Sequence, residues 1–276
     1  MNKNFFIMGA PNAGKSTYLA ALWHSINQKS IATSLTLKKM TGDLQYLYQL
    51  EHKWLEIEQL ERTVIGQEKM QLILLLTDGE CDLNLEFPDL SGETFQNIYE
   101  TRELTVELYE KISKADVILY FINIENIFPA ELISKLPSEL RTEENLLESR
   151  KPSEHDPTQV QVIDLLQIIL EIKREPIQLG IILSAWDLLE NNESVNPKKF
   201  LEEKMSMLWQ FIESNNKKLF TKVWGVSALG GKIEDVDRLL SIEEPINRIK
   251  VVNEANMVSQ DVTSIISELS GELYDN

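Results

Sequence analysis

A glycine-rich segment near the start of the chain has the residue types and spacing of a phosphate-binding loop (P-loop). The pattern Gly-x-x-x-x-Gly-Lys-Ser is formed by Gly9, Gly14, Lys15 and Ser16, directly after an apolar run at 5–8. The two glycines let the backbone curl so that consecutive amide N–H groups point inward, and the helix that follows adds the positive end of its dipole. The sequence therefore predicts a site for a chain of two or three phosphates.

The side chains of this loop have separate expected roles. Lys15 would place its ammonium group at the β- and γ-phosphates, and the Ser16 hydroxyl would be a ligand of Mg²⁺. The expected phosphate contacts are Gly9, Asn12, Ala13, Gly14, Lys15, Ser16 and Thr17. A chance glycine turn between a strand and a helix is the alternative, and four fixed positions in the right order argue against it.

A second group of polar residues, 89–93, follows another apolar run at 81–87. Downstream of a phosphate loop, Asp89 would hold Mg²⁺ through water, and Gly92 would let a backbone N–H reach the γ-phosphate. Without that loop, Asp-x-x-Gly is equally well a polar turn. Glu93 comes next and could accept a proton from the attacking water, but a carboxylate beside a polyanion predicts slow turnover.

Composition limits the class of protein. The 276 residues are 43% hydrophobic, enough for a sizeable core, and we expect one elaborated domain. A net charge of −17 argues against nucleic-acid or anionic-membrane partners. The single cysteine, Cys81, is compatible with a reducing cytosol. Because we find neither a leader pattern nor an apolar run of about 20 residues, we expect a cytoplasmic protein without a membrane segment.

Strand-like and helix-like segments alternate along the chain. Strands are predicted at 5–8, 69–77, 81–87, 115–124, 179–183 and 222–226, with one more candidate at 31–40. Helices are predicted at 16–28, 43–60, 94–113, 160–173 and 196–214. This alternation predicts an α/β fold with a mostly parallel six-stranded sheet, helices on both faces and one antiparallel edge strand from the hairpin at Asp78-Gly79. In such sheets ligands bind beyond the carboxyl ends of the strands, where all the polar motifs lie.

In these motifs the chain resembles the P-loop GTPases of the translation-factor-like (TRAFAC) superclass. Residues 9–16 correspond to the first motif of that family, 89–92 to the third, 184–187 to a degenerate fourth and 227–229 to the fifth. The resemblance covers about residues 3–240 and implies a G domain. More narrowly, the Asp-x-Ser-Gly-Glu and Ser-x-Trp-Asp forms, and a tail at 245–263, are similar to the bacterial double-GTPase families of multi-gene conflict systems.

The resemblance implies that the fourth motif selects the base. The Asp187 carboxylate can accept hydrogen bonds from guanine N1–H and the 2-amino group, whereas adenine offers no such pair. Ser227 and the Ala228 N–H would brace Asp187 and the guanine O6. The remaining expected nucleotide contacts are Ser184, Trp186 and Leu229; Trp186 would wall the pocket or pack on the sheet. Ala185 and Leu229 stand where the family has lysines, and a plain strand-to-loop cap remains the alternative for 184–187.

The resemblance also requires a threonine that reaches Mg²⁺ when the γ-phosphate is present. The candidates are Thr33, Thr36, Thr41 and Thr63. We choose Thr63 because it lies just before the hairpin, with Thr41 as the alternative. The expected metal ligands are then Ser16, Thr63 and Asp89, and the catalytic set is Lys15, Thr63, Gly92 and Glu93. On this choice the helix at 43–60 is an insertion whose position would report the nucleotide state.

The sequence thus predicts a GTP-binding switch that hydrolyses GTP to GDP slowly with Mg²⁺ and acts on a protein partner, and that could form a homodimer. Residues 1–240 would be the GTPase domain, with a helical insertion near 43–60 and a surface insertion near 127–158. Residues 241–276 would be an extension that packs on the domain or on a partner. The rival functions are a non-hydrolysing nucleotide-bound scaffold and a P-loop ATPase or small-molecule kinase.

Overall fold

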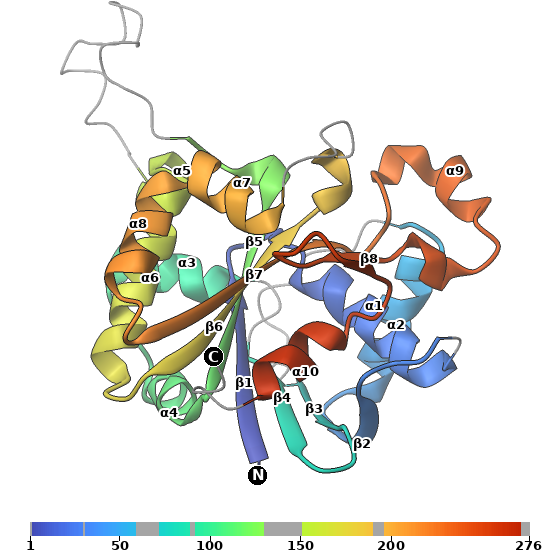
Figure 1. The fold of residues 1–276 in the computed structure, drawn as a ribbon, viewed down its shortest axis with the longest axis horizontal. Coiled ribbons are helices and arrows are strands. Elements are labelled where there is room, and N and C mark those ends of the chain that lie inside the picture. The colour runs from blue at the N-terminus through green and yellow to red at the C-terminus, as the bar shows by residue number, and fades with distance from the viewer. Residues whose placement is uncertain are drawn as a thin grey trace, which may run out of the picture.

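A single mixed sheet forms the centre of the molecule (Figure 1). The structure, a computed structural model, describes residues 2–29, 31–58, 72–88, 92–129, 151–189 and 196–271. In these residues the strand order is β2-β3-β4-β1-β5-β6-β7-β8-β9. The strands are β1 (Asn2–Gly9), β2 (Thr36–Thr41), β3 (Leu72–Thr77), β4 (Asp82–Phe87), β5 (Val117–Asn123), β6 (Ile177–Ser184), β7 (Leu219–Ser227), β8 (Lys250–Val252) and β9 (Val258–Ser259).

The α/β class is as predicted, and the sheet is larger than predicted. Strands β4, β1, β5, β6 and β7 are parallel neighbours, while β3 is antiparallel to both β2 and β4. The sequence predicts six strands with the hairpin strand at the edge, whereas the sheet has nine and β2 lies outside β3. At the other edge β8 and β9 add two antiparallel strands from the C-terminal extension. These two strands are so short that no periodicity marks them.

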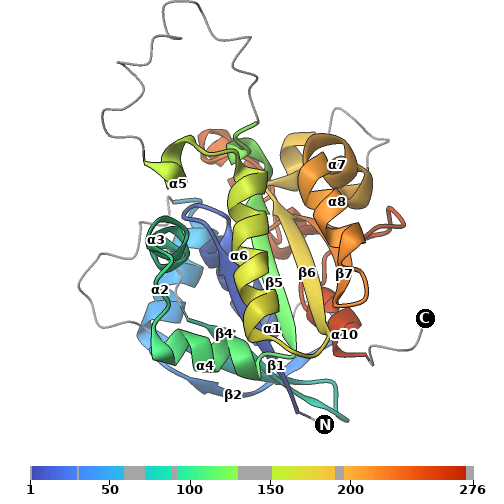
Figure 2. The same ribbon diagram turned by 90° about the vertical axis from the view of Figure 1, so that its left-hand side faces the viewer.

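Helices cover both faces of the sheet (Figure 2). They are α1 (Lys15–Gln28), α2 (Leu44–Leu55), α3 (Glu93–Thr101), α4 (Val106–Lys114), α5 (Pro152–His155), α6 (Thr158–Ile172), α7 (Pro197–Lys204), α8 (Ser206–Ser214), α9 (Val236–Leu240) and α10 (Ser264–Ser270). Alternate residues of β1 divide between two cores: Phe5 and Ile7 join α1, α2 and α10, while Phe6 and Met8 join α3, α4, α6, α7 and α8. None of the described helices combines the length and apolar character needed to cross a membrane.

Two predicted helices are each divided in the structure. The segment 94–113 forms α3 and α4, because Arg102 ends α3 in the left-handed region (φ +61°) and the Thr105 hydroxyl accepts the Leu108 N–H at the start of α4. The segment 196–214 forms α7 and α8, which meet at Met205 (φ −131°). Both breaks shorten the helices, and all four resulting helices pack into the core that contains Phe6 and Met8.

The C-terminal residues pack into the same core as the first helix. Val262, Ile265, Ile266 and Leu269 are buried together with residues of α1. The Tyr18 hydroxyl on α1 donates to the Val262 carbonyl at 2.8 Å, and burial raises the pKa of that hydroxyl, so it stays a donor.

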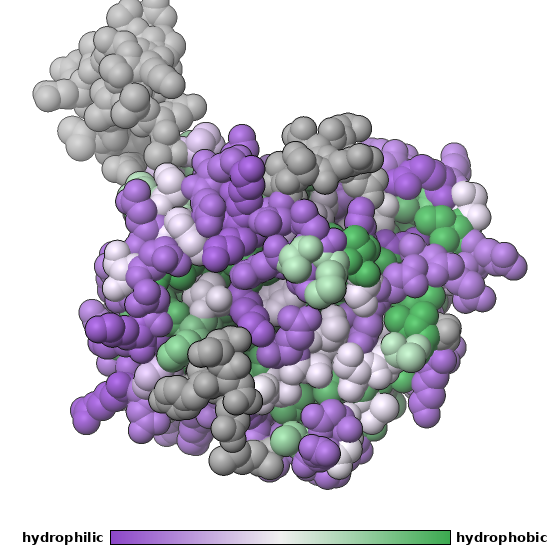
Figure 3. All heavy atoms as spheres, in the orientation of Figure 1, coloured by the Kyte–Doolittle hydropathy of each residue, from purple (hydrophilic) through white to green (hydrophobic). Residues whose placement is uncertain are grey.

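The surface is more polar than this core. Hydrophilic side chains cover much of the face in Figure 3, in keeping with the net charge of −17.

Candidate functional site

The loop between β1 and α1 is built from backbone conformations that favour glycine. Gly9 (φ +149°), Asn12 (φ +59°) and Gly14 (φ +88°) all have positive φ, so the chain reverses tightly before the helix begins. A methyl group on Gly14 would lie 2.8 Å from both Cβ and Oγ of Ser184. Glycine is therefore needed at position 14 for its conformation and for the close approach of β6.

Lys15 lies over this loop. Its side chain is buried, with 2% of the residue exposed, and Nζ donates to the carbonyl oxygens of Gly9 and Ala10, both at 2.9 Å. These bonds hold the ammonium group across the loop opening instead of letting it extend into solvent. A positive charge in that place is suited to phosphate oxygens that enter the loop.

A cavity of about 650 Å³ extends from the loop to the ends of β6 and β7. The predicted residues that line it are Asn12, Ala13, Gly14, Lys15, Ser16, Thr17, Ser184, Asp187, Ala228 and Leu229. The cavity is also lined by residues that were not predicted from the sequence, among them Trp54, Glu58, Asn123, Asn126 and Lys232. The carboxyl ends of β1, β6 and β7 thus meet at one cavity, which is lined by both the phosphate loop and Asp187.

Asp187 is held in place by the end of β7. Its Oδ1 accepts a hydrogen bond from the Ser227 hydroxyl at 2.5 Å. The Ser227 Oγ in turn accepts the Gly230 N–H at 3.2 Å, and Ser227 is only 1% exposed. Ala185, at φ +57°, turns the chain after β6 so that Asp187 lies on the cavity side. The carboxylate is therefore oriented before any ligand arrives.

Two further side chains brace the phosphate loop from neighbouring strand ends. Ser184 Oγ donates to the Ala13 carbonyl at 2.8 Å, and Asn123 Nδ2 donates to the Asn12 carbonyl at 3.1 Å. Ser184, which we expected to contact the nucleotide, also holds the loop. The only signal for Asn123 in the sequence is its position at the end of the apolar run 115–124.

Trp186 does not line the cavity, contrary to its place among the expected nucleotide contacts. Its ring is 6% exposed and packs edge-on against Phe200 with centroids 5.5 Å apart. Gly225 lies directly beneath it, since a methyl group there would come within 2.3 Å of the ring. The alternative role, packing on the sheet, is the one the structure shows.

Of the third motif, Gly92 and Glu93 are described, whereas Asp89 lies outside the described residues, as does Thr63. Gly92 (φ +78°) packs on the phosphate loop, because a methyl group on it would lie 2.6 Å from the Ala10 carbonyl carbon and from the Pro11 nitrogen. Thr41, the alternative to Thr63, ends the edge strand β2, with β3 and β4 between it and β1. The third motif thus directly contacts the first.

We expect Gly92→Ala to weaken GTP binding about tenfold or more while GDP binding changes little, since the added methyl group displaces the N–H proposed to reach the γ-phosphate. Titration with fluorescent GTP and GDP analogues measures both affinities. Gly79→Ala is the matched control: Gly79 also has positive φ (+99°), but nothing lies within 4 Å of an added methyl group. If the ratio of GTP affinity to GDP affinity is the same in the two variants, this role for Gly92 is contradicted.

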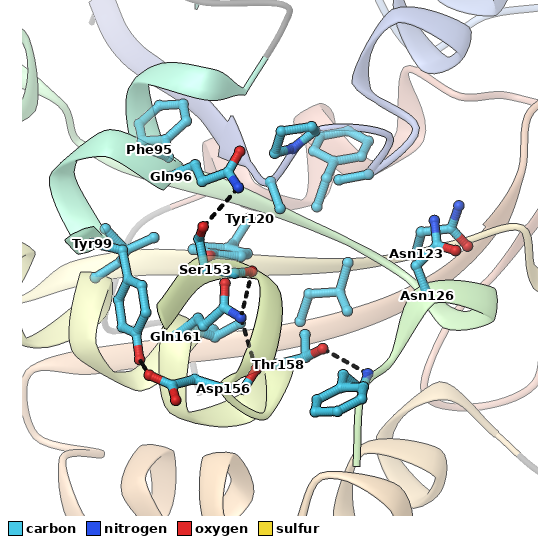
Figure 4. Close-up of a pocket in the computed structure, with 18 of the residues that line it drawn as sticks. Phe95, Gln96, Tyr99, Tyr120, Asn123, Asn126, Ser153, Asp156, Thr158 and Gln161 are labelled. Atoms are coloured by element: carbon cyan, nitrogen blue, oxygen red, sulfur yellow. Dashed lines mark hydrogen bonds between the residues drawn. The ribbon is translucent and has the colours of Figure 1, made fainter. Parts of the chain in front are cut away.

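A second cavity, of about 430 Å³, adjoins the phosphate loop on the side of α3 (Figure 4). Ala10, Pro11 and Glu93 line it together with residues of α5 and α6. Across it, Gln96 Nε2 donates to Ser153 Oγ at 2.8 Å, and the Tyr99 hydroxyl donates to Asp156 Oδ2 at 2.6 Å. Helix α3, which begins directly after the third-motif glycine, is therefore tied to α5 and to Asp156, the residue that follows α5.

Together, the phosphate loop between β1 and α1 and the oriented carboxylate at the end of β6 define a nucleotide-binding G domain of the P-loop GTPase class. The model of the Double-GTPase 1 family matches residues 6–269. The chain therefore belongs to the Double-GTPase 1 family, which confirms the resemblance to TRAFAC-type P-loop GTPases and the predicted fold class. No curated protein sequence matches the chain significantly.

Solved structures with a similar fold have low identity to this chain. They include the G domain of the T. maritima FeoB iron transporter (14% identity, 86% of this chain and 96% of that chain, TM-score 0.36). The small GTPase Arl6 of Trypanosoma brucei, with bound GppNp, matches at 10% identity over 87% of this chain and 96% of its own (TM-score 0.41). The S. cerevisiae Ski7 GTPase-like domain, bound to GDP and inorganic phosphate, matches at 16% identity over 83% of this chain and 43% of its own (TM-score 0.41). Likenesses this weak carry no argument about activity.

Proposed function

We propose that this protein is a guanine-nucleotide switch that binds GTP with Mg²⁺ and hydrolyses it to GDP. The observation that carries the proposal is the oriented carboxylate of Asp187, which lines the same cavity as the phosphate loop. A nucleotide whose phosphates occupy the loop would extend its base toward Asp187. A carboxylate there is matched by the N1–H and 2-amino donors of guanine and would be left unpaired by adenine.

Of the three proposed magnesium ligands, only Ser16 is among the described residues, and its position suits a nucleotide site. Ser16 lines the cavity at the first turn of α1, next to Lys15, and its hydroxyl is a hard oxygen ligand. Asp89 and Thr63, outside the described residues, are the other proposed ligands. No cluster of three or more His, Cys, Asp or Glu occurs in the described residues, but Mg²⁺ in such sites uses few carboxylates and takes phosphate oxygens as ligands. When bound, the ion would neutralise charge on the β- and γ-phosphates.

Glu93 is the residue of this chain proposed to act on the attacking water. It begins α3 directly after Gly92 and lines the second cavity beside Ala10 and Pro11. A carboxylate in that place could take a proton from water, but it also repels the nucleotide. We therefore propose slow intrinsic turnover that a protein partner increases. The tie between α3 and α5 supports a switch, because a shift of α3 on loss of the γ-phosphate would have to move α5 or break two hydrogen bonds.

A non-hydrolysing, nucleotide-bound scaffold is the second candidate. Glu93 favours it, because it stands where many related GTPases carry the glutamine that orients water. Such a scaffold would hold GTP tightly and release no phosphate. The two functions share the binding site and differ only in turnover.

The test begins with the nucleotide that copurifies with the protein, released by denaturation and identified by mass. We expect GDP or GTP. Competition of GTP and ATP for the emptied site, followed by phosphate release under single-turnover conditions, then measures specificity and hydrolysis. Preference for ATP would contradict the proposed guanine site. Tight binding of GTP with no release of phosphate, with or without a partner, would favour the scaffold.

A further inference from the structure

Helix α2 reaches the nucleotide cavity through one side chain, Trp54. This tryptophan is fully buried (0% exposed), lines the cavity, and its indole N–H donates to the Ala228 carbonyl at 2.8 Å. Ala228 begins the loop after β7 and directly follows Ser227, the last residue of that strand and the partner of Asp187. The two residues joined by this hydrogen bond lie 174 positions apart in the chain.

The indole ring of Trp54 packs against two other side chains. The Arg248 guanidinium lies over one side at 4.4 Å from the ring centroid, and the His24 ring lies 5.0 Å away at an angle of 43°. Cation–π stacking of a buried arginine is stronger than at an exposed site, because water does not compete. His24 is itself hydrogen-bonded to Glu51 one turn earlier on α2, at 2.7 Å. The direction of the indole N–H is therefore determined by three elements of the fold.

Arg248 also holds the end of α2 and packs on the same loop. Its Nη1 approaches the Leu55 carbonyl at 3.5 Å, at the C-terminal end of the helix dipole, where a cation is favoured. Burial lowers the pKa of Arg248 to about 10, so the group remains protonated at neutral pH. Gly230 touches it: a methyl group on Gly230 would lie 2.7 Å from the Arg248 Cβ. The loop thus contacts the Trp54–Arg248 pair at two points.

A hydrogen bond to the Ala228 carbonyl restricts more than one atom. The Ala228 N–H, which we expect to meet the guanine O6, belongs to the peptide shared with Ser227. The Ala228 carbonyl belongs to the next planar peptide, so holding that carbonyl restricts the backbone on the C-terminal side of this N–H. The loop is then held at Ser227 by Asp187 and at Ala228 by Trp54. An amide that must meet the 6-oxo group of a purine needs such support, because a displacement of an ångström would lose the hydrogen bond.

We propose that Trp54 is a positioning residue for guanine recognition: its indole N–H holds the Ala228 carbonyl, so that the N–H of the same residue is presented to the 6-oxo group of the base. Arg248 acts through Trp54 by keeping the indole in place. This inference rests on the proposed guanine site, and it assigns the 6-position to the loop supported by α2, separately from the 1- and 2-positions assigned to Asp187.

The test compares Trp54→Phe with Trp23→Phe. Trp23 is a matched control because it is also buried, at 3% exposed, while its Nε1 has no hydrogen-bond partner among the residues that the structure describes. Both variants lose the same atoms from a core, but only Trp54→Phe loses a hydrogen bond. Thermal melting shows whether the two variants are equally folded. We expect Trp54→Phe to bind GDP about 3- to 10-fold more weakly than Trp23→Phe, the range expected for one hydrogen bond.

Two GDP analogues separate a positioning effect from general loosening. In 6-thio-GDP a sulfur, a weak acceptor, replaces O6; IDP lacks only the 2-amino group. We expect Trp54→Phe to reduce the preference for GDP over 6-thio-GDP and to leave the preference for GDP over IDP as in the parent, since Asp187 is untouched. Arg248→Lys, which keeps the charge but not the flat stacking surface, should change the 6-thio-GDP ratio in the same direction by less.

The inference is overturned if Trp54→Phe and Trp23→Phe have the same GDP affinity and the same ratio of GDP to 6-thio-GDP affinity. It is also overturned if Trp54→Phe changes the 6-thio-GDP ratio and the IDP ratio equally. If the parent protein binds no GDP at all, that result contradicts the proposed guanine site itself. Failure of the inference and failure of the proposed function are therefore distinct results.

Discussion

A Lys15→Ala variant is expected to bind GTP and GDP at least about 100-fold more weakly than the parent, because it loses the charge-assisted hydrogen bonds that we propose to two phosphates. Lys15 is almost fully buried over the loop, and its Nζ already lies within 2.9 Å of the Gly9 and Ala10 carbonyls. The ammonium group therefore needs little rearrangement to meet a phosphate. Alanine leaves the inward-pointing amides but removes the charge.

Isothermal titration with GDP, with and without Mg²⁺, measures this loss. Lys39→Ala is the control, since Lys39 is an exposed lysine on β2, at the edge of the sheet, and its removal changes the net charge equally. Thermal melting without nucleotide shows whether Lys15→Ala folds. A folded variant that binds GDP as tightly as the Lys39→Ala control would contradict the proposed phosphate site.

An Asp187→Asn variant is expected to lose guanine binding by about 100-fold and to bind xanthosine diphosphate more tightly than GDP, from two changed hydrogen bonds. In the proposed site the carboxylate would accept from both N1–H and the 2-amino group. An amide has an acceptor oxygen and a donor NH₂, which match the N1–H and the 2-oxo group of xanthine. The Ser227 hydroxyl, now 2.5 Å from Oδ1, can still donate to the amide oxygen. The side chain therefore keeps its orientation while its hydrogen-bonding pattern is exchanged.

Competition between GDP, XDP and ADP measures this exchange. Asp237→Asn, on the exposed surface of α9, removes one negative charge in the same way without touching the cavity. That control should retain the parent's order of affinities. Unchanged GDP binding by Asp187→Asn would remove this residue from the base site and leave the loop at 227–231 as the remaining candidate for base recognition.

Much of the fold could be predicted from the sequence because its central strands are continuous apolar runs. Both faces of β5 and β6 are covered by helices, so Val117–Ile122 and Ile177–Ser184 are buried throughout. In the sequence β5 shows as an unbroken apolar run, and β6 shows as the shorter run 179–183, which lacks polar side chains. The edge strand β2 overlaps the candidate strand at 31–40, whereas the opposite edge could not be predicted. β8 and β9 hold three and two residues, and they form because Val251 and Val252 pair with the end of β7. Long-range pairing decides such short strands, and no local periodicity precedes it.

For the site, the sequence by itself determined the phosphate loop and its lysine, because eight consecutive residues contain all of that chemistry. It also located the carboxylate at 187 and the serine at 227, each at the end of an apolar strand. Only the tertiary structure decided that Trp186 packs on Phe200 and that Asn123, Trp54 and Arg248 support the site. These contacts join residues more than a hundred positions apart, or turn a side chain to one face of the sheet. Residue type and local spacing say nothing of either, since both depend on how the elements pack.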